Sequence, residues 1–353
     1  MVATIAERQQ AALEHLGFQL ERAAPVVEVE RADPRGFRGA VTASAMGTRV
    51  AITVVTKSRS RAESSALAAL EAMRRYVAMF DRHDASSVLT HFNQTGRLDA
   101  APRPLMDLVL RSRAFHRLTG GGFDITVAPL LELLRSAAGS PTPRLPTLRE
   151  IREIRELVGQ EYLVVEGERL SSTRAGMQIT LDGVAKGAIV DVMAATLRRH
   201  GIKNFLIDAG GDIRLAGRNE RGVPWRVGVR DPAGDRCLPE ALDLTGGAVA
   251  TSGDYARAIG DTGLTHHIVN RAEAASPRHC RSVTVIAPTA LAADALATGA
   301  FVVGPRRALT LIDRLRGCAC LVIDRHGALM TSRRWPRMTP IPQERVEDHD
   351  RTS

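Results

Sequence analysis

The chain has few aromatic residues and few lysines for its length. Phe, Trp and Tyr make up 4% of the 353 residues, too few for the stacking platforms with which single-strand binders hold successive bases. The only lysines are Lys57, Lys186 and Lys203, and the formal charge of +9 comes from arginines scattered along the chain. Positive charge suits nucleic acid or an anionic small ligand. Because aromatic rings are scarce and the arginines form no periodic face, we favour the small ligand.

The sequence also lacks long hydrophobic runs. None approaches the roughly 20 apolar residues that cross a bilayer, so we expect no membrane span. Residues 1–10 have no basic segment followed by an apolar one, which argues against a secretory signal. We therefore predict a cytoplasmic location, with export in complex with a partner as the alternative.

Cysteines are few and irregularly spaced. Cys237, Cys280, Cys318 and Cys320 match neither a zinc pattern nor a disulfide framework, so we predict reduced thiols. A redox role for Cys318 and Cys320 is the weaker alternative. There is also no Walker A motif, no G-x-G-x-x-G after a strand and no nucleophile elbow, so the standard nucleotide-binding folds are not indicated.

The patterns that are present mix helices and strands without regular alternation, which predicts an α+β fold. Helical spacing of apolar residues predicts helices at residues 60–80, 105–118, 127–134, 184–200, 291–303 and 306–315. Runs of β-branched and apolar residues predict strands at residues 49–56, 204–208, 225–230, 248–251, 265–269, 282–286 and 320–324.

We expect one main domain over residues 41–330. Residues 1–40 are polar and weakly patterned, which predicts an N-terminal arm or helix. Residues 331–353 are rich in Pro, Arg and acidic residues without periodicity, which predicts a disordered tail. The Pro- and Gly-containing stretch near residues 139–147 marks either a subdomain break or a surface insertion, and we favour the insertion.

The segment from Leu181 to Gly187 (LDGVAKG) joins a predicted strand to a predicted helix. Such a junction offers unpaired backbone N–H groups and the positive end of a helix dipole to a phosphate. Gly183 and Gly187 let the backbone approach a ligand, and Lys186 adds a positive charge. Asp182 alone is better explained as a helix cap. The segment predicts a site for a phosphate-bearing nucleotide together with Mg²⁺.

Asp294 and Thr298 occupy positions i and i+4 of a predicted helix and therefore share one of its faces. Hard oxygen ligands of this kind suit Mg²⁺, which takes few protein carboxylates and completes its shell with water and phosphate. Taken alone, a surface aspartate that caps the helix and a threonine that bonds back to the chain are the simpler interpretation.

Other polar groups follow predicted strands. The segment from Thr251 to Tyr255 (TSGDY) is a polar turn, and residues 121–124 and 209–212 are glycine turns that end in aspartate. The adjacent His266 and His267 lie on a predicted strand, so at most one of them faces a site. A histidine is the natural general base near neutral pH, although a single histidine on a strand is more often structural.

The order of these motifs is more specific than any one of them. In sequence order they are Met46-Gly-Thr48, Ser87 to Asn93, Gly122-Phe-Asp124, Asp182 to Asp191, Gly210-Gly-Asp212, Ser252-Gly-Asp-Tyr255, His267-Ile268 and Asp294 to Thr298. The series resembles the ApbE family of FAD:protein FMN transferases over about residues 45–305. The resemblance implies a flavin-transferase fold of the α+β class. It also implies Mg²⁺-dependent cleavage of FAD, in which FMN moves to a threonine hydroxyl of an acceptor flavoprotein and AMP is released.

The resemblance further implies roles for single residues. Met46 would contact the flavin, and His267 would be the base that activates the acceptor threonine. Mg²⁺ would be held by Asp294, Thr298 and the backbone carbonyl of Gly183. The other positions implied to bind FAD are His83, Gly122, Phe123, Asp124, Asp182, Lys186, Ser252, Asp254 and Ile268.

Three positions depart from the family's pattern. His83 stands where an aromatic residue usually precedes the Ser…Asn motif, and Thr180 stands where Asp is frequent, with Asp182 as the candidate that compensates. After His267-Ile268, the usual Asp-Pro-x-Thr-Gly turn is replaced by Asn270-Arg-Ala-Glu-Ala274. The alternative functions are therefore an FAD-binding protein or an FAD pyrophosphatase that releases FMN and AMP. A basic nucleic-acid-binding protein is the third and least favoured class.

Overall fold

The protein is described here by a computed structural model. The structure describes residues 25–32, 36–138, 144–232, 234, 237–254, 258–259 and 265–340. Tyr255, residues 139–143, the first 24 residues and residues 341–353 therefore lie outside the described part of the chain.

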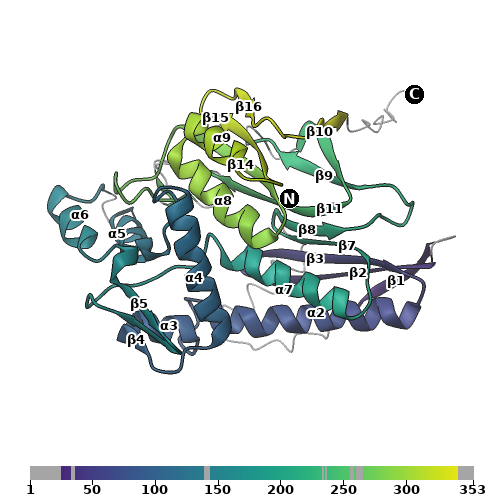
Figure 1. The fold of residues 1–353 in the computed structure, drawn as a ribbon, viewed down its shortest axis with the longest axis horizontal. Coiled ribbons are helices and arrows are strands. Elements are labelled where there is room, and N and C mark those ends of the chain that lie inside the picture. Colours follow the sequence, from purple (N-terminus) through teal and green to yellow (C-terminus); the bar gives the residue numbers. More distant parts are fainter. Residues whose placement is uncertain are drawn as a thin grey trace, which may run out of the picture.

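A large antiparallel sheet forms the centre of the molecule (Figure 1). In the described residues its order is β1-β2-β3-β7-β8-β11-β14-β15-β16, and neighbouring strands pair antiparallel throughout. The strands are β1 (Glu28–Ala32), β2 (Gly36–Ala45), β3 (Thr48–Thr56), β7 (Asn204–Ala209), β8 (Asp212–Ala216), β11 (Gly246–Gly253), β14 (Cys280–Ala287), β15 (Ala319–Asp324) and β16 (Leu329–Thr331). With the helices described below, this sheet confirms the α+β class.

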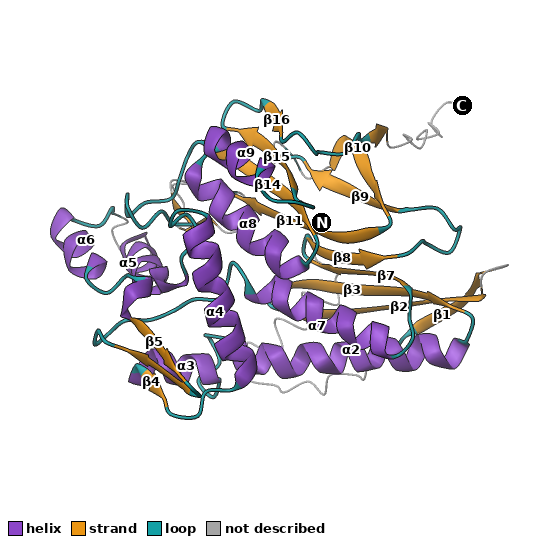
Figure 2. Cartoon of the chain, viewed as in Figure 1, coloured by secondary structure: helices purple, strands orange, loops and turns teal. Residues whose placement is uncertain are grey.

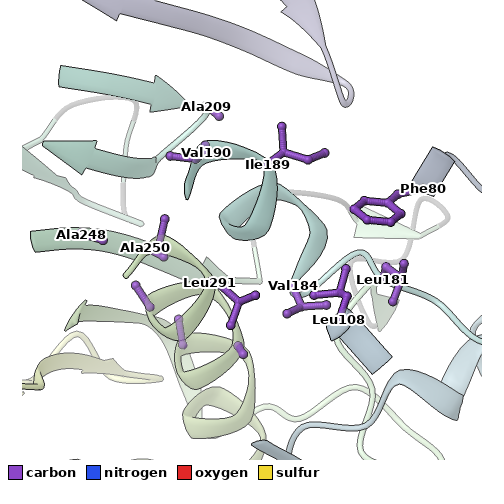
Figure 3. Packing of buried hydrophobic residues seen from close by; sticks show 14 of the residues in the cluster. Phe80, Leu108, Leu181, Val184, Ile189, Val190, Ala209, Ala248, Ala250 and Leu291 are labelled. Carbon is purple, nitrogen blue, oxygen red and sulfur yellow. The ribbon is translucent and has the colours of Figure 1, made fainter. Parts of the chain in front are cut away.

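One face of the sheet is covered by a row of helices, α2 (Arg59–Phe80), α7 (Ala185–Arg199), α8 (Ala290–Val303) and α9 (Pro305–Asp313). They follow the order of the strands beneath them: α2 contacts β2 and β3, α7 contacts β7 and β8, α8 contacts β11 and β14, and α9 contacts β15. Figure 3 shows Val184 and Leu291 packed together where α7 begins beside α8. This junction fixes the place where the predicted phosphate-binding segment meets the predicted metal-binding helix.

The helices α7 and α8 approach each other closely at Gly187. A side-chain carbon at this position would clash with the carbonyl oxygen of Ala290. Gly187 therefore serves the packing of two helices, where the sequence predicted close approach of a ligand.

The opposite face of the sheet is covered by three strands, β9 (Trp225–Arg230), β10 (Cys237–Leu244) and β17 (Thr339–Pro340). Buried and exposed side chains alternate along β9, as expected of a strand with one covered face. Trp225 and Leu242 pack there against Val55 and Leu321 of the large sheet.

Both chain ends depart from the predicted domain boundaries. Of the expected arm over residues 1–40, Glu28–Ala32 and part of Gly36–Ala45 are paired strands of the large sheet. Of the expected tail, residues 331–340 are ordered: the Ser332 hydroxyl accepts the Cys320 N–H at 2.8 Å, and Thr339 pairs with Ala241. These contacts form because both segments complete the edges or the cover of a sheet, which a local pattern of apolar residues does not reveal.

A smaller lobe lies at one end of the large sheet (Figure 2). Its helices are α3 (Val88–Thr95), α4 (Arg103–Leu118), α5 (Ala128–Ala138) and α6 (Leu148–Arg155), with the short turns η1 (Ile125–Val127) and η2 (Gln160–Tyr162). Its strands are β4 (Arg97–Leu98), β5 (Leu163–Glu166) and β6 (Arg169–Ser172). Of the predicted strand at residues 265–269, only β13 (Thr265–His266) forms, paired with β12 (Ala258–Ile259). None of the helices in the described residues is long and apolar enough to cross a membrane.

Candidate active site

A cavity of about 420 Å³ lies where the small lobe meets the large sheet and its helices. The predicted site residues that line it are Met46, His83, Gly122, Phe123, Asp124, Asp182, Gly183, Lys186, Ser252, His267, Ile268, Asp294 and Thr298. Asp254 is absent from this wall and follows strand β11, where its backbone N–H donates to the Arg281 carbonyl at 3.1 Å. Segments far apart in the sequence thus converge on one cavity.

The three positions predicted to hold a metal lie together. Asp294 is 4% exposed, so the alternative of a surface capping aspartate is wrong. Its Oδ2 accepts the backbone N–H of Gly187 at 3.0 Å. Thr298 packs against Gly183, where an added Cβ would lie 3.0 Å from the Thr298 Oγ1. The same Oγ1 is 3.2 Å from the hydroxyl of Ser252.

The electrostatics of Asp294 suit a cation. The pKa of Asp294 is raised to about 8, mainly by burial and also by the neighbouring Asp212 carboxylate, while Lys186 opposes the shift. A bound cation would keep such a carboxylate ionised. The oxygen donors are those that Mg²⁺ prefers. The described residues contain no group of three His, Cys, Asp or Glu side chains suited to a metal, so water or substrate oxygens would complete the shell.

Lys186 lines the cavity and is held by an ion pair. Its Nζ lies 2.5 Å from Oδ2 of Asp212, a buried residue at the end of the glycine turn 209–212. The sequence singled out this turn but gave Asp212 no role. Asp191, the last residue of the phosphate-binding motif, accepts the N–H groups of Ala290 and Leu291, each at 3.0 Å. Asp191 therefore caps α8 instead of facing the cavity.

Arg82 is a cavity residue that sequence reasoning missed. Its Nη2 lies 3.2 Å from Oδ2 of Asp182, and both residues line the cavity. Asp182 does not cap α7, because the residue before that helix is Val184 and no side chain caps it. Arg82 directly precedes His83 in the sequence, but no local pattern distinguishes it from the many other arginines.

The two adjacent histidines separate as predicted, one toward the cavity and one away from it. His267 lines the cavity. The side chain of His266 is buried, with Nδ1 accepting the Ile268 N–H at 3.3 Å and Nε2 3.0 Å from the Pro277 carbonyl. Burial lowers the pKa of His266, which favours the neutral ring that these two bonds require. Of these two residues, His267 is therefore the one placed to act on a ligand.

Asp124 lines the cavity and also organises the small lobe. Its Oδ1 accepts from the Thr126 backbone N–H at 2.8 Å, the Thr126 hydroxyl at 2.6 Å and the Gln160 side chain at 3.1 Å. The Ser87 to Asn93 motif also has a supporting role, since Asn93 forms a pair of hydrogen bonds to the backbone of Ile179 at 2.9 and 2.8 Å. Both residues fix the loops that carry the cavity wall.

The substituted segment after Ile268 still forms a compact turn. The Asn270 side chain accepts the Ala272 N–H at 2.9 Å, the Ala274 N–H donates to the Asn270 carbonyl at 2.8 Å, and Ala274 adopts a φ of 53°. Arg271 joins this turn to the small lobe, with Nη2 donating to Glu161 at 3.0 Å and Nη1 lying 3.8 Å from Asp124. A different set of contacts therefore closes the turn beside His267.

The buried cysteines are poor candidates for redox chemistry. Cys318 and Cys320 are buried free thiols, and burial raises the pKa of Cys320 to about 12. Since the thiolate is the reactive form, these residues are inert. The side chain of Cys237 lies outside the described residues.

Known proteins share this sequence pattern and this fold. The family model described as the ApbE family matches residues 46–322. The chain belongs to the ApbE family. A curated ApbE-family relative named FAD:protein FMN transferase, from Vibrio cholerae, is 34% identical over 232 residues, which are 64% of this chain and 70% of the relative. A relative of the same name from Escherichia coli strain K12 is 30% identical over 70% of this chain and 73% of its own length.

Solved ApbE structures agree with the whole architecture. The crystal structure of an ApbE protein from Thermotoga maritima superposes with a TM-score of 0.75 at 32% identity and covers 84% of this chain and 97% of its own. A flavin transferase ApbE structure from Vibrio cholerae has a TM-score of 0.73 at 28% identity and covers 87% of this chain and 97% of its own. The flavin-transferase fold predicted from the ordered motifs is confirmed.

Proposed function

We propose that this protein is a Mg²⁺-dependent FAD:protein FMN transferase. The observation that carries the proposal is the convergence of Asp294, Thr298, Gly183 and His267 on one cavity. The names of the relatives support the same reaction. In it, an acceptor hydroxyl oxygen attacks the FMN phosphorus of FAD, the bond between the two phosphate groups breaks, and AMP leaves.

The acceptor group is proposed to be a threonine hydroxyl. His267 takes the hydroxyl proton as the new bond to phosphorus forms, because histidine is a common general base for a hydroxyl nucleophile. The lobe residues Phe123 and Ile268 and the β2–β3 turn residue Met46 supply apolar surface for the flavin. In phosphoryl transfer this positioning carries much of the catalysis.

The proposed metal position is formed by Asp294, Thr298 and the carbonyl of Gly183. Mg²⁺ held there would neutralise negative charge on the phosphate groups of FAD. Lys186 adds positive charge next to the same position, and Asp212 holds its ammonium group in place at 2.5 Å. The cytoplasmic location stays a prediction from the sequence.

The decisive experiment combines the purified protein with FAD, Mg²⁺ and an FMN-binding acceptor domain. We expect a fluorescent flavin that stays on the acceptor in a denaturing gel, needs Mg²⁺ and is lost when the acceptor threonine is changed to Val. An unlabelled acceptor with free FMN and AMP in solution would instead identify an FAD pyrophosphatase. Bound FAD without any turnover would identify a flavin-binding protein and overturn the proposal.

A further inference from the structure

Arg82 is a largely buried cation in the cavity wall, and two nitrogens of its guanidinium form no hydrogen bond within the described residues. Its side chain is 11% exposed. Although Nη2 lies 3.2 Å from Asp182, neither Nη2 nor Nε forms a hydrogen bond of good geometry within the described residues. Leaving buried donors of a charged group unsatisfied is costly, and such donors are completed by water, an ion or a ligand.

Arg82 lies beside the part of the cavity where the proposed metal position and the start of α7 would meet the phosphate groups of FAD. Its partner Asp182 directly precedes Gly183, the residue whose carbonyl is proposed to face the metal, and α7 begins two residues later with its N-terminus at the cavity. A guanidinium presents several N–H donors in a planar fork, which matches the oxygens of a phosphate group. The fork of Arg82 is thus near the place where a diphosphate would meet the metal.

We propose that Arg82 binds the diphosphate of FAD and exchanges Asp182 for phosphate oxygens when the substrate enters. The proposal rests on the proposed function, because it assumes that FAD occupies this cavity. Asp182 holds the guanidinium at the wall before the substrate arrives and competes with the substrate for it. Removing Arg82 and removing the charge of Asp182 therefore have opposite effects on the binding of phosphate-bearing flavins.

A purely structural ion pair makes a different prediction. The pair joins the end of α2 to the segment before α7, so it could act only as a tie between two elements. In that case Arg82→Gln and Asp182→Asn would both lower the melting temperature. Both would also weaken the binding of riboflavin, FMN and FAD to the same degree, because an ion pair that only joins two elements makes no contact with a phosphate group.

The test measures dissociation constants of riboflavin, FMN and FAD by flavin fluorescence, without Mg²⁺, for the full-length wild-type protein and its variants. We expect Arg82→Gln to weaken FAD binding about 10-fold or more, as for a lost charge-assisted bond, and riboflavin binding less than about twofold. We expect Asp182→Asn to tighten FAD binding and Arg82→Lys to give an intermediate value. Arg74→Gln, which removes a charge from the exposed side of α2, the helix that ends just before Arg82, is the matched control.

The outcomes separate this inference from the proposed function. Equal weakening of riboflavin and FAD by Arg82→Gln, or weaker FAD binding by Asp182→Asn, overturns the role of Arg82. If the wild-type protein transfers FMN while Arg82→Gln binds FAD normally, only this inference fails. If the wild-type protein binds no flavin, both fail. Should Arg82→Gln not fold, Arg82→Lys and Asp182→Asn still decide, because their effects on FAD relative to riboflavin are predicted separately.

Discussion

Two glycines on the sheet side of the cavity pack closely against α8, whereas the turn after Ile268 on the lobe side is held by ion pairs. On the sheet side, Gly187 lies against Ala290 and Gly183 lies against Thr298. On the lobe side, Arg271 reaches Asp124 and Glu161 across 3.8 and 3.0 Å. Close packing admits one residue type at a position, while an ion pair can be rebuilt from other residues.

The departures from the ApbE pattern lie at polar positions of the cavity wall. The Lys186-Gly187 and Asp294 to Thr298 motifs on the sheet side are kept. The substitutions lie at His83, at Thr180 with Asp182, and in the turn at residues 270–274. Each of these has new polar partners in this structure or lies beside a residue that has them. On the lobe side Gly122-Phe-Asp124 and His267-Ile268 are also kept, so the departures are confined to a few polar positions of the cavity wall.

The largest effect is expected on the sheet side from Asp294→Asn. Removing the carboxylate takes away the charged ligand of the proposed metal position, so Mg²⁺-dependent FAD turnover should fall about 10³-fold or more. Steady-state release of AMP measures it, with the exposed Asp99→Asn as the control. The buried Asp294 carboxyl favours its neutral form. Without metal, the melting temperature of Asp294→Asn should therefore be no lower than that of the metal-free wild-type protein. Full turnover by Asp294→Asn would contradict the assignment.

Substitutions of the two adjacent histidines should have different kinds of effect, one on the transfer rate and one on stability. His267→Gln removes the proposed base, so the transfer rate should fall by roughly 10²–10⁴ while FAD still binds. His266→Gln disturbs two buried hydrogen bonds and should lower the melting temperature instead. Single-turnover labelling and thermal melts separate the two results. A stable, inactive His266→Gln protein beside an active His267→Gln protein would reverse the assignment.

Gly187→Ala tests close packing directly. The added methyl group meets the Ala290 carbonyl, and overpacking of this kind costs about 1–3 kcal/mol of unfolding free energy. Urea denaturation measures the loss. Gly246→Ala is the matched control, because a Cβ there meets nothing within 4 Å. Equal stability of the two variants would show that the helix crossing adapts.

Arg271→Ala should have the smallest effect. Its ion pairs are partly exposed, so their loss should cost less than about 1 kcal/mol of stability. The transfer rate should fall by up to about fivefold, since the turn beside His267 becomes looser. Arg149→Ala, in a fully exposed pair of α6, is the control. A loss as large as that of Gly187→Ala would show that the lobe wall tolerates change no better than the sheet wall.

The sequence predicted the elements that carry a strong local pattern. The helices predicted at residues 60–80, 184–200 and 291–303 correspond to α2, α7 and α8 within a residue or so. Strand β2 was missed because its run of small residues (GFRGAVTASA) has no clear alternation. It forms because β3 pairs with it along its whole length, and such pairing is a property of two segments together.

The candidate site was predictable to a similar extent. The order of the motifs led us to expect Asp294, Thr298 and His267 at one site. The structure places all three in the wall of one cavity. The pairs Arg82–Asp182 and Lys186–Asp212 were not predicted. Each joins residues from separate elements, so neither spacing nor residue type reveals the partner before the fold is known.

The exchange of hydrogen bonds between α7 and α8 has a consequence for ligand entry. Asp191 of α7 accepts two N–H groups from the start of α8, and Asp294 of α8 accepts one from the first turn of α7. Neither helix can slide along the other without leaving buried amides unpaired. The Asp294 carboxylate, which we propose to bind the metal, therefore loses its conformational freedom when the chain folds. The entropic cost of ordering it would then not fall on an arriving cation.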